Sequence, residues 1–163
     1  MYSLLQIAGI GPAWVLWDAD LTMLAGQLAD GNPFRLPVVA PARGYLVLSP
    51  AVAGSISLLG PPGGADWVPT DVHLPADVDL PADVDLPAAS VYVPQAAAPD
   101  APLSLYQLRQ AADVSGLADE ILVAMQNGTP VVLEVSSGTQ AGTLVLNGAS
   151  LPFAVVCPPA AAG

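Results

Sequence analysis

The chain has 163 residues and a formal net charge of −11, because fourteen acidic residues face only three basic ones, Arg35, Arg43 and Arg109. This balance argues against nucleic-acid binding, which needs basic groups to displace counterions, and against binding to an anionic membrane surface. Cys157 is the single cysteine, which excludes an internal disulfide and favours a reducing compartment. No basic segment typical of a signal peptide and no long uninterrupted apolar run is present, so we expect a cytoplasmic protein or a virion component.

Two stretches of the chain resemble each other. Gly31 and Gly128 are each followed two residues later by a proline. Further on, Gly-Tyr-Leu-Val-Leu-Ser (44–49) matches Gly-Thr-Leu-Val-Leu-Asn (142–147), and each stretch ends on Pro-Pro (61–62 and 158–159). We therefore predict an α+β fold, a tandem duplication of an α-β-β-β unit of about 60 residues. A unit of that size buries a marginal core alone, so we expect the copies to pack as a pseudo-dimer with a shared core.

This interpretation divides the chain into four segments. The first αβββ repeat covers 1–62, an acidic Pro- and Asp-rich linker covers 63–103, the second repeat covers 104–159, and 160–163 form a tail.

The first repeat contains one clear helix signal. Residues 3–10 are apolar and fit either a short helix or a strand, but Leu21, Leu24 and Leu28 recur at helical spacing. Asp18 or Asp20 is placed to cap this helix, and Gly31 is placed to end it. Short strands are predicted over 37–40, 45–48 and 55–59.

The linker is recognised by its composition. Residues 60–103 contain seven of the twelve Asp, no Lys or Arg, and a hexapeptide that occurs three times between 72 and 89, as in Val-Asp-Leu-Pro-Ala-Asp (78–83). Regular prolines remove amide donors and hold a chain extended, so we predict a linker in preference to a hexapeptide β-helix. One edge strand is expected over 91–93.

The second repeat should again place helix before strands. Leu105, Leu108 and Ala112 fit one helix face, and Ser115 is placed to cap a second helical stretch that stops at Gly128. Strands over 131–135, 143–146 and 153–156, with a tight turn at 147–148, predict a β-meander.

No residue pattern indicates catalysis. Asp18 and Asp20 fit a helix cap better than a metal site, because no third ligand is near in sequence. His73 is the only histidine and lies in the linker without a partner to orient it, while apolar neighbours favour a buried, inert Cys157. We therefore expect no catalytic, cofactor-binding or metal-binding residues, and no enzyme.

Three tryptophans, Trp14, Trp17 and Trp67, are candidate partner-binding residues, because tryptophan is enriched in interface hot spots. The alternative is that Trp14 and Trp17 fill the core.

The sequence favours a non-catalytic structural or protein-interaction module. It would be an adaptor in a bacterium of high GC content, or an accessory or decoration subunit of a larger assembly such as a phage virion. The protein partner would present a basic surface or bind an exposed strand edge. The alternative is a small-molecule binder with an apolar pocket between the repeats, lined by Trp14, Trp17 and Tyr45. The oligomeric state stays open.

Overall fold

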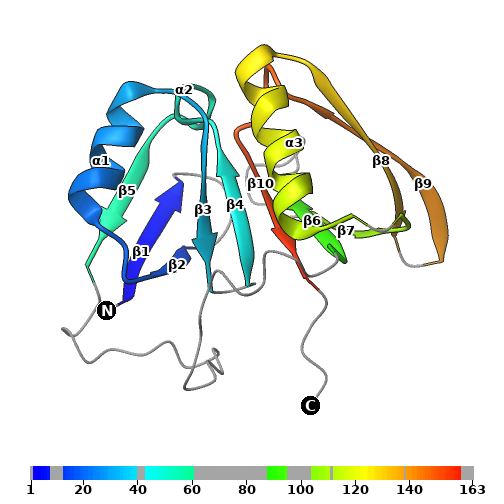
Figure 1. Cartoon of the computed structure of the whole chain (residues 1–163), viewed down its shortest axis with the longest axis horizontal. Helices are drawn as coiled ribbons and strands as arrows, with labels where there is room; N and C mark the ends of the chain where they lie inside the picture. The colour runs from blue at the N-terminus through cyan, green and yellow to red at the C-terminus, as the bar shows by residue number, and fades with distance from the viewer. Residues whose placement is uncertain are drawn as a thin grey trace.

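The computed structural model describes residues 2–7, 13–39, 43–60, 88–94, 104–110, 112–137 and 139–158 (Figure 1). Of these residues, 49% lie in strands and 25% in helices, so the fold is predominantly β. The elements in chain order are β1 (Tyr2–Ile7), β2 (Trp14–Trp17), α1 (Leu21–Asp30), β3 (Phe34–Val38), β4 (Gly44–Leu48), α2 (Pro50–Ala53), β5 (Ile56–Leu59), β6 (Ser90–Val93), β7 (Ser104–Leu108), α3 (Val114–Asn127), β8 (Pro130–Ser137), β9 (Gln140–Asn147) and β10 (Phe153–Cys157).

The strands form two sheets. Seven antiparallel strands follow the order β3-β4-β10-β6-β7-β8-β9, and a smaller sheet has the order β2-β1-β5. The predicted α+β tandem duplication, packed as a pseudo-dimer of αβββ units, is therefore wrong. Two strands precede each long helix, and strands from both halves of the chain join one large sheet.

The predicted β-meander is also wrong. Strands β8 and β9 form a hairpin, but β10 does not continue from β9 and instead lies between β4 and β6. Strand β6 was expected at an edge and lies in the interior of the sheet, between β10 and β7. Both differences come from pairing between segments far apart in sequence, which a local pattern does not encode.

The helix predicted around Leu105, Leu108 and Ala112 is a strand, β7. In it Tyr106 and Leu108 pack against the core, whereas Leu105 is 46% exposed, which is the alternation of a strand. A spacing of three therefore misled the prediction. Helix α3 begins later, and its N-cap is Asp113, which accepts a hydrogen bond from the Gly116 amide, rather than the predicted Ser115.

The other predicted helix ends are confirmed. The Asp20 carboxylate accepts hydrogen bonds of 3.0 Å from the amides of Thr22 and Met23, which caps α1. Gly31 (φ 74°) and Gly128 (φ 66°) end α1 and α3 in the left-handed conformation that glycine adopts without strain.

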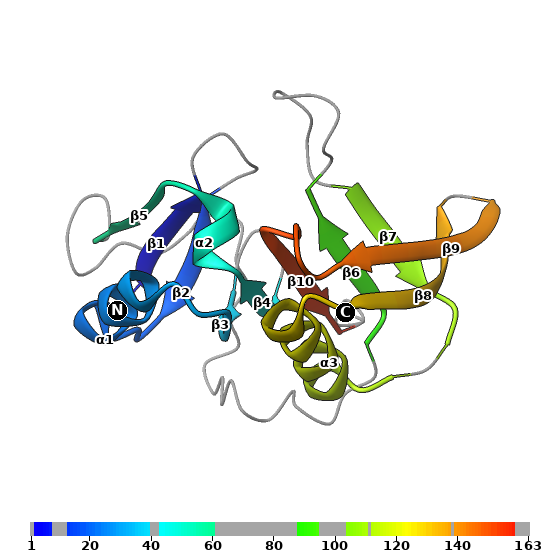
Figure 2. The ribbon, with the colours of Figure 1, turned by 90° about the horizontal axis from the view of Figure 1, so that it is seen from above.

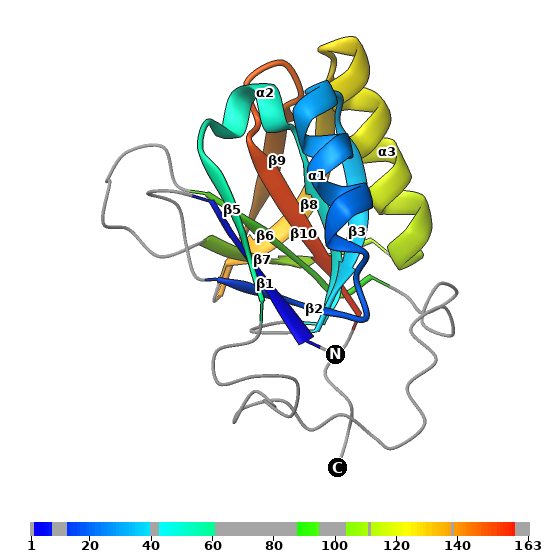
Figure 3. The same ribbon diagram turned by 90° about the vertical axis from the view of Figure 1, so that its left-hand side faces the viewer.

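The large sheet is covered on both faces. One face packs against the apolar side of α3 through a buried cluster that includes Val47, Val91, Ala154, Val156 and Ile121. The opposite face packs against the small sheet and α1 through a second cluster that includes Leu46, Phe153, Val155, Leu5 and Trp14. Figures 2 and 3 show α1 with the small sheet and α3 lying over different parts of the large sheet. Strand β10 is buried along its whole length, because its alternate side chains enter the two clusters.

Most of the predicted linker 63–103, namely 63–87 and 95–103, and the tail 160–163 lie outside the described residues. No helix in the described part of the chain is long and apolar enough to span a membrane.

Candidate interaction surface

The two halves of the chain meet where β4 pairs with β10, which we call the β4–β10 junction. Its register runs from Leu48 opposite Phe153 to Tyr45 opposite Val156. The Ser49 amide donates a 2.9 Å hydrogen bond to the Pro152 carbonyl, in line with this register. Because hydrogen-bonded and non-bonded pairs alternate in antiparallel strands, Val47 and Tyr45 direct their backbone groups toward β10.

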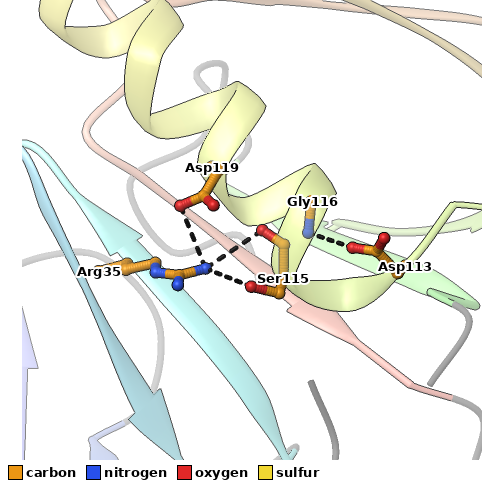
Figure 4. Close-up of polar contacts among 5 residues, drawn as sticks. All are labelled: Arg35, Asp113, Ser115, Gly116 and Asp119. Carbon is orange, nitrogen blue, oxygen red and sulfur yellow. Dashed lines mark hydrogen bonds and ion pairs between the residues drawn. The ribbon is translucent and has the colours of Figure 1, made fainter. Parts of the chain in front are cut away.

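Helix α3 reaches across this junction to β3 (Figure 4). The Arg35 Nη1 donates hydrogen bonds of 3.1 Å and 2.9 Å to the carbonyl and hydroxyl oxygens of Ser115. The same nitrogen lies 3.2 Å from the Asp119 carboxylate, and the guanidinium carbon lies 5.0 Å from the centroid of the Tyr45 ring. The guanidinium thus connects the two halves on the face that α3 covers.

Gly44 allows the strands of the junction to approach each other. A Cβ atom at this position would collide with the backbone carbonyl of Val156. Glycine in a strand often marks such a close backbone approach.

The ends of the sheets differ in how they are protected. Edge strands in natural proteins are commonly blocked by proline, by charge or by covering segments. Strand β3 contains Arg35 and Pro37, and beyond its end the Val39 amide donates a 2.9 Å hydrogen bond to the Val15 carbonyl of β2. In contrast, among the described strands β9 pairs only with β8 and β5 only with β1, and neither β9 nor β5 contains a charged residue or a proline.

The open edge of β9 has defined hydrogen-bonding groups. The Gly148 amide donates a 3.1 Å hydrogen bond to the Thr129 carbonyl, in register with the β8–β9 pairing. Alternation from this pair directs the backbone groups of Leu144 and Leu146 toward β8, and those of Thr143 and Val145 outward. We call these outward amides and carbonyls the β9 edge.

An apolar patch lies beside this edge. Val132 and Val145 are directly opposite each other in β8 and β9, and they are 60% and 59% exposed. We call these two residues the valine pair. Their outer face and the β9 edge together form the candidate interaction surface.

The predicted tryptophan residues lie in different surroundings. Trp14 is fully buried, with its ring centroid 6.5 Å from that of Tyr92 and 6.3 Å from that of Phe153, and its Nε1 has no hydrogen-bond partner among the described residues. Trp17 is 40% exposed and its ring centroid lies 4.7 Å from that of Tyr2. Trp67 lies outside the described residues. Trp14 therefore occupies the core, and a partner could reach Trp17 without any change in the fold.

The residues suggested for an apolar pocket are not brought together. Trp14 belongs to the cluster of the small sheet, whereas Tyr45 packs in the α3 cluster beside Arg35. A different cavity of about 300 Å³ lies between α3 and strands β7 and β8, within the second half of the chain. It is lined by Leu108, Gln110, Ala112, Leu117, Glu120, Val132, Leu133 and Glu134.

The described residues contain neither a thiol that is ionised near neutral pH nor a cluster of metal-binding side chains. Burial raises the pKa of the Cys157 thiol to about 12, so the thiol is not ionised near neutral pH. Burial also raises the pKa of Tyr92, and the nearby charge of an ionised Cys157 raises it further. The described residues contain no group of three or more acidic, histidine or cysteine side chains that could hold a metal ion, and His73 lies outside them.

Sequence reasoning missed the β9 edge. The available signal was the match between 44–49 and 142–147. The two matching segments form β4, which is largely buried, and β9, which is largely exposed. No protein-family model, curated protein or solved structure matches this chain.

Proposed function

We propose that the protein is a non-catalytic structural or protein-interaction module, an adaptor or an accessory subunit of a larger assembly, that binds protein by strand addition at β9. The observation that carries this proposal is the unblocked β9 edge next to the exposed valine pair. In strand addition, main-chain hydrogen bonds supply affinity and neighbouring side-chain pockets or patches supply selectivity.

The chemistry of the surface defines the partner. Strand β9 is uncharged and its outward groups are amides and carbonyls, so the partner supplies an extended, uncharged segment. An apolar side of the partner would cover Val132 and Val145. Seven of the acidic residues lie in 61–103, so an electrostatic contribution from a basic partner surface would come from that segment and not from β9.

The alternative function, binding of a small molecule, has weaker support. The cavity beside α3 is not between the two halves, and Glu120 and Glu134 contribute to its lining, unlike an apolar ligand pocket.

Affinity capture with edge-blocked variants tests the proposal. Val145→Pro removes an outward amide of β9 and leaves the β8–β9 hydrogen bonds intact, which is the setting in which a strand tolerates proline. Ala141→Pro also removes an outward amide, but it lies near the hairpin turn and away from the valine pair. We expect a protein captured by the tagged chain, identified by mass spectrometry, to be lost with Val145→Pro and retained with Ala141→Pro. Equal capture by both variants would exclude the β9 edge as the site.

A second variant separates the body from the acidic segment. Residues 63–87 are replaced by a neutral Gly/Ser linker of equal length, which keeps β6 because that strand lies in the interior of the sheet. Loss of the partner with this variant and its retention with Val145→Pro would assign binding to the acidic segment instead.

A further inference from the structure

We propose that copies of this chain associate head to tail, with β9 of one copy pairing antiparallel with β5 of the next, in the way that β4 pairs with β10 within one chain. This inference rests on the proposed function and names the partner at the β9 edge as a second copy. Figure 2 shows β5 and β9 at opposite ends of the protein, so each copy presents one strand of each kind.

Strand β9 has the features that β4 uses in the β4–β10 junction. Each is the second strand after a long helix, and each contains Gly-x-Leu-Val-Leu, at 44–48 and 142–146. In β4 the backbone groups of Tyr45 and Val47 face β10, and in β9 those of Thr143 and Val145, at the same places in this motif, face outward. The open edge of β9 therefore has the hydrogen-bonding pattern of an edge that is filled elsewhere in the same chain.

Gly142 supplies an independent observation. Its counterpart Gly44 is required because a Cβ atom there would collide with the carbonyl of the paired strand. At Gly142 a Cβ atom would meet nothing within 4 Å, and this residue does not have a positive φ. Nothing described in the single chain therefore requires a glycine at 142, but a strand that approached β9 as β10 approaches β4 would require one.

Strand β5 resembles β10 in its position and sequence. Each is a mainly apolar strand, and at most one residue separates its end from a Pro-Pro sequence, which lies at 61–62 after β5 and at 158–159 after β10. Strand β5 is uncharged, and Leu59 is 47% exposed. In the small sheet the Val39 amide bonds to the Val15 carbonyl, so alternation through β2 and β1 directs the backbone groups of Ile56 and Leu58 away from β1. Transfer of the β4–β10 register, with the last residues of β5 and β10 aligned, then places Ile56, Ser57, Leu58 and Leu59 opposite Val145, Leu144, Thr143 and Gly142 of the neighbouring copy.

The valine pair also has a place in this arrangement. Val132 of β8 lies opposite Val145 of β9, just as Arg35 of β3 lies opposite Val47 of β4. In the single chain, Arg35 contacts helix α3. In the association between copies, α1 of the next copy would take the place of α3. Helix α1 has an exposed face of small residues, which lets it approach the two valines and remove them from water. This face consists of Thr22, Ala25, Gly26 and Ala29.

Such a contact joins two different surfaces, so it does not close in a dimer. A head-to-tail interface generates a ring if the rotation between copies closes, and a filament if it does not.

Gly142→Ala is the first test, measured by sedimentation velocity of the purified full-length chain from micromolar to millimolar concentration. We expect the wild type to form species larger than a dimer, and Gly142→Ala to remain a monomer with an unchanged thermal unfolding midpoint. A wild type that remains monomeric over this range would overturn the inference. The proposed function would still hold in that case if Val145→Pro abolished the capture of another protein. Assembly that persists in both Gly142→Ala and Val145→Pro would exclude the β9 edge as the contact between copies.

Mixing two blocked variants tests the head-to-tail geometry. Val145→Pro blocks β9 and leaves β5 open, whereas Leu58→Pro removes an outward amide of β5 and leaves β9 open. Each should be monomeric alone, and their mixture should form dimers and nothing larger. Dimers of either variant alone would indicate an interface between like edges and overturn the proposal.

Cross-linking tests the register and does not depend on the folding of a proline variant. In a Cys157→Ala background, a Val145→Cys chain is mixed with an Ile56→Cys chain and oxidised. Directly paired residues lie about 5.5 Å apart between Cα atoms, which a disulfide can bridge. We expect a disulfide-linked dimer. Replacing Val145→Cys by Ala141→Cys, four residues away on the same face, should abolish it, and equal cross-linking at both positions would contradict the register.

Discussion

The Arg35 guanidinium of β3 lies 3.2 Å from the Asp119 carboxylate of α3, and it also donates to both oxygens of Ser115. One of the three cationic side chains in this acidic protein therefore connects the first half of the chain to the second. It does so on the α3-covered face of the β4–β10 junction.

Arg35→Met should lower the free energy of unfolding by about 1–2 kcal/mol, because it removes two hydrogen bonds and the contact with the Tyr45 ring as well as the ion pair. Asp119→Asn should cost less, about 0.5 kcal/mol, because the Asp119 side chain is 57% exposed and the ion pair is screened by water. Urea denaturation at low and at 1 M salt measures both values. The Asp119→Asn effect should shrink at high salt, and the matched control Arg109→Met, at an exposed position, should be close to neutral.

Gly44→Ala and Gly142→Ala should differ in their effects on the folded monomer, although they change the same motif. The new methyl group at 44 meets the Val156 carbonyl, which is backbone and cannot rotate away, so we expect a loss of about 1–3 kcal/mol. At 142 it meets open space, and the stability of the dilute monomer should not fall. Thermal and urea unfolding of both variants at micromolar concentration checks this difference. Equal destabilisation would show that the space around Gly142 is already occupied within one chain.

The sequence predicted those features that depend on neighbouring residues. Asp20 and Gly31 bound α1 as expected, because a capping carboxylate and a left-handed glycine act within one turn of a helix. The position of β10 between β4 and β6 could not be predicted in the same way, since it depends on pairing with strands about 65 and about 110 residues away in sequence. The match between 44–49 and 142–147 was visible in the sequence, but its interpretation as two equivalent αβββ units was wrong.

The candidate site was harder to predict than the helices. The tryptophans were predicted to bind a partner because of their residue type, yet Trp14 is fully buried. The β9 edge consists of backbone groups beside ordinary residues such as Thr143 and Val145, and an open edge exists only because no other described strand pairs there. Residue type alone therefore could not indicate it.

Trp14→Ala should be among the most destabilising single substitutions, with a loss of about 3–5 kcal/mol, because the indole is fully buried between Tyr92 and Phe153. Trp14→Phe should cost clearly less, since it keeps an aromatic ring and removes an Nε1–H that has no described partner. Urea unfolding followed by circular dichroism compares them. A phenylalanine variant as unstable as the alanine variant would mean that the indole nitrogen is satisfied in solution.

Alkaline pH should destabilise the protein through Cys157. Its pKa rises from 9.0 to about 12 on folding, so between these values the native state binds more protons than the unfolded state. Its stabilising contribution is complete below pH 9 and is lost as the pH rises toward 12, with a slope of at most about 1.4 kcal/mol per pH unit. The slope of unfolding free energy against pH should be shallower in Cys157→Ala. Tyr92, whose pKa is also raised, should leave a residual slope that Tyr92→Phe removes.

Amide hydrogen exchange along β9 should alternate in the dilute monomer. The amides of Leu144 and Leu146 bond to β8 and should exchange slowly, whereas those of Thr143 and Val145 face outward and should exchange at rates close to those of an unstructured chain. Exchange measured by NMR at micromolar concentration resolves each residue. At high concentration Thr143 and Val145 should become protected in the wild type, because β5 of a neighbouring copy then accepts their hydrogen bonds. In Gly142→Ala the alternation should persist at every concentration. Protection of Thr143 and Val145 already present in the dilute chain would show that another part of the same chain covers the β9 edge, and that edge would then be unavailable to a second copy.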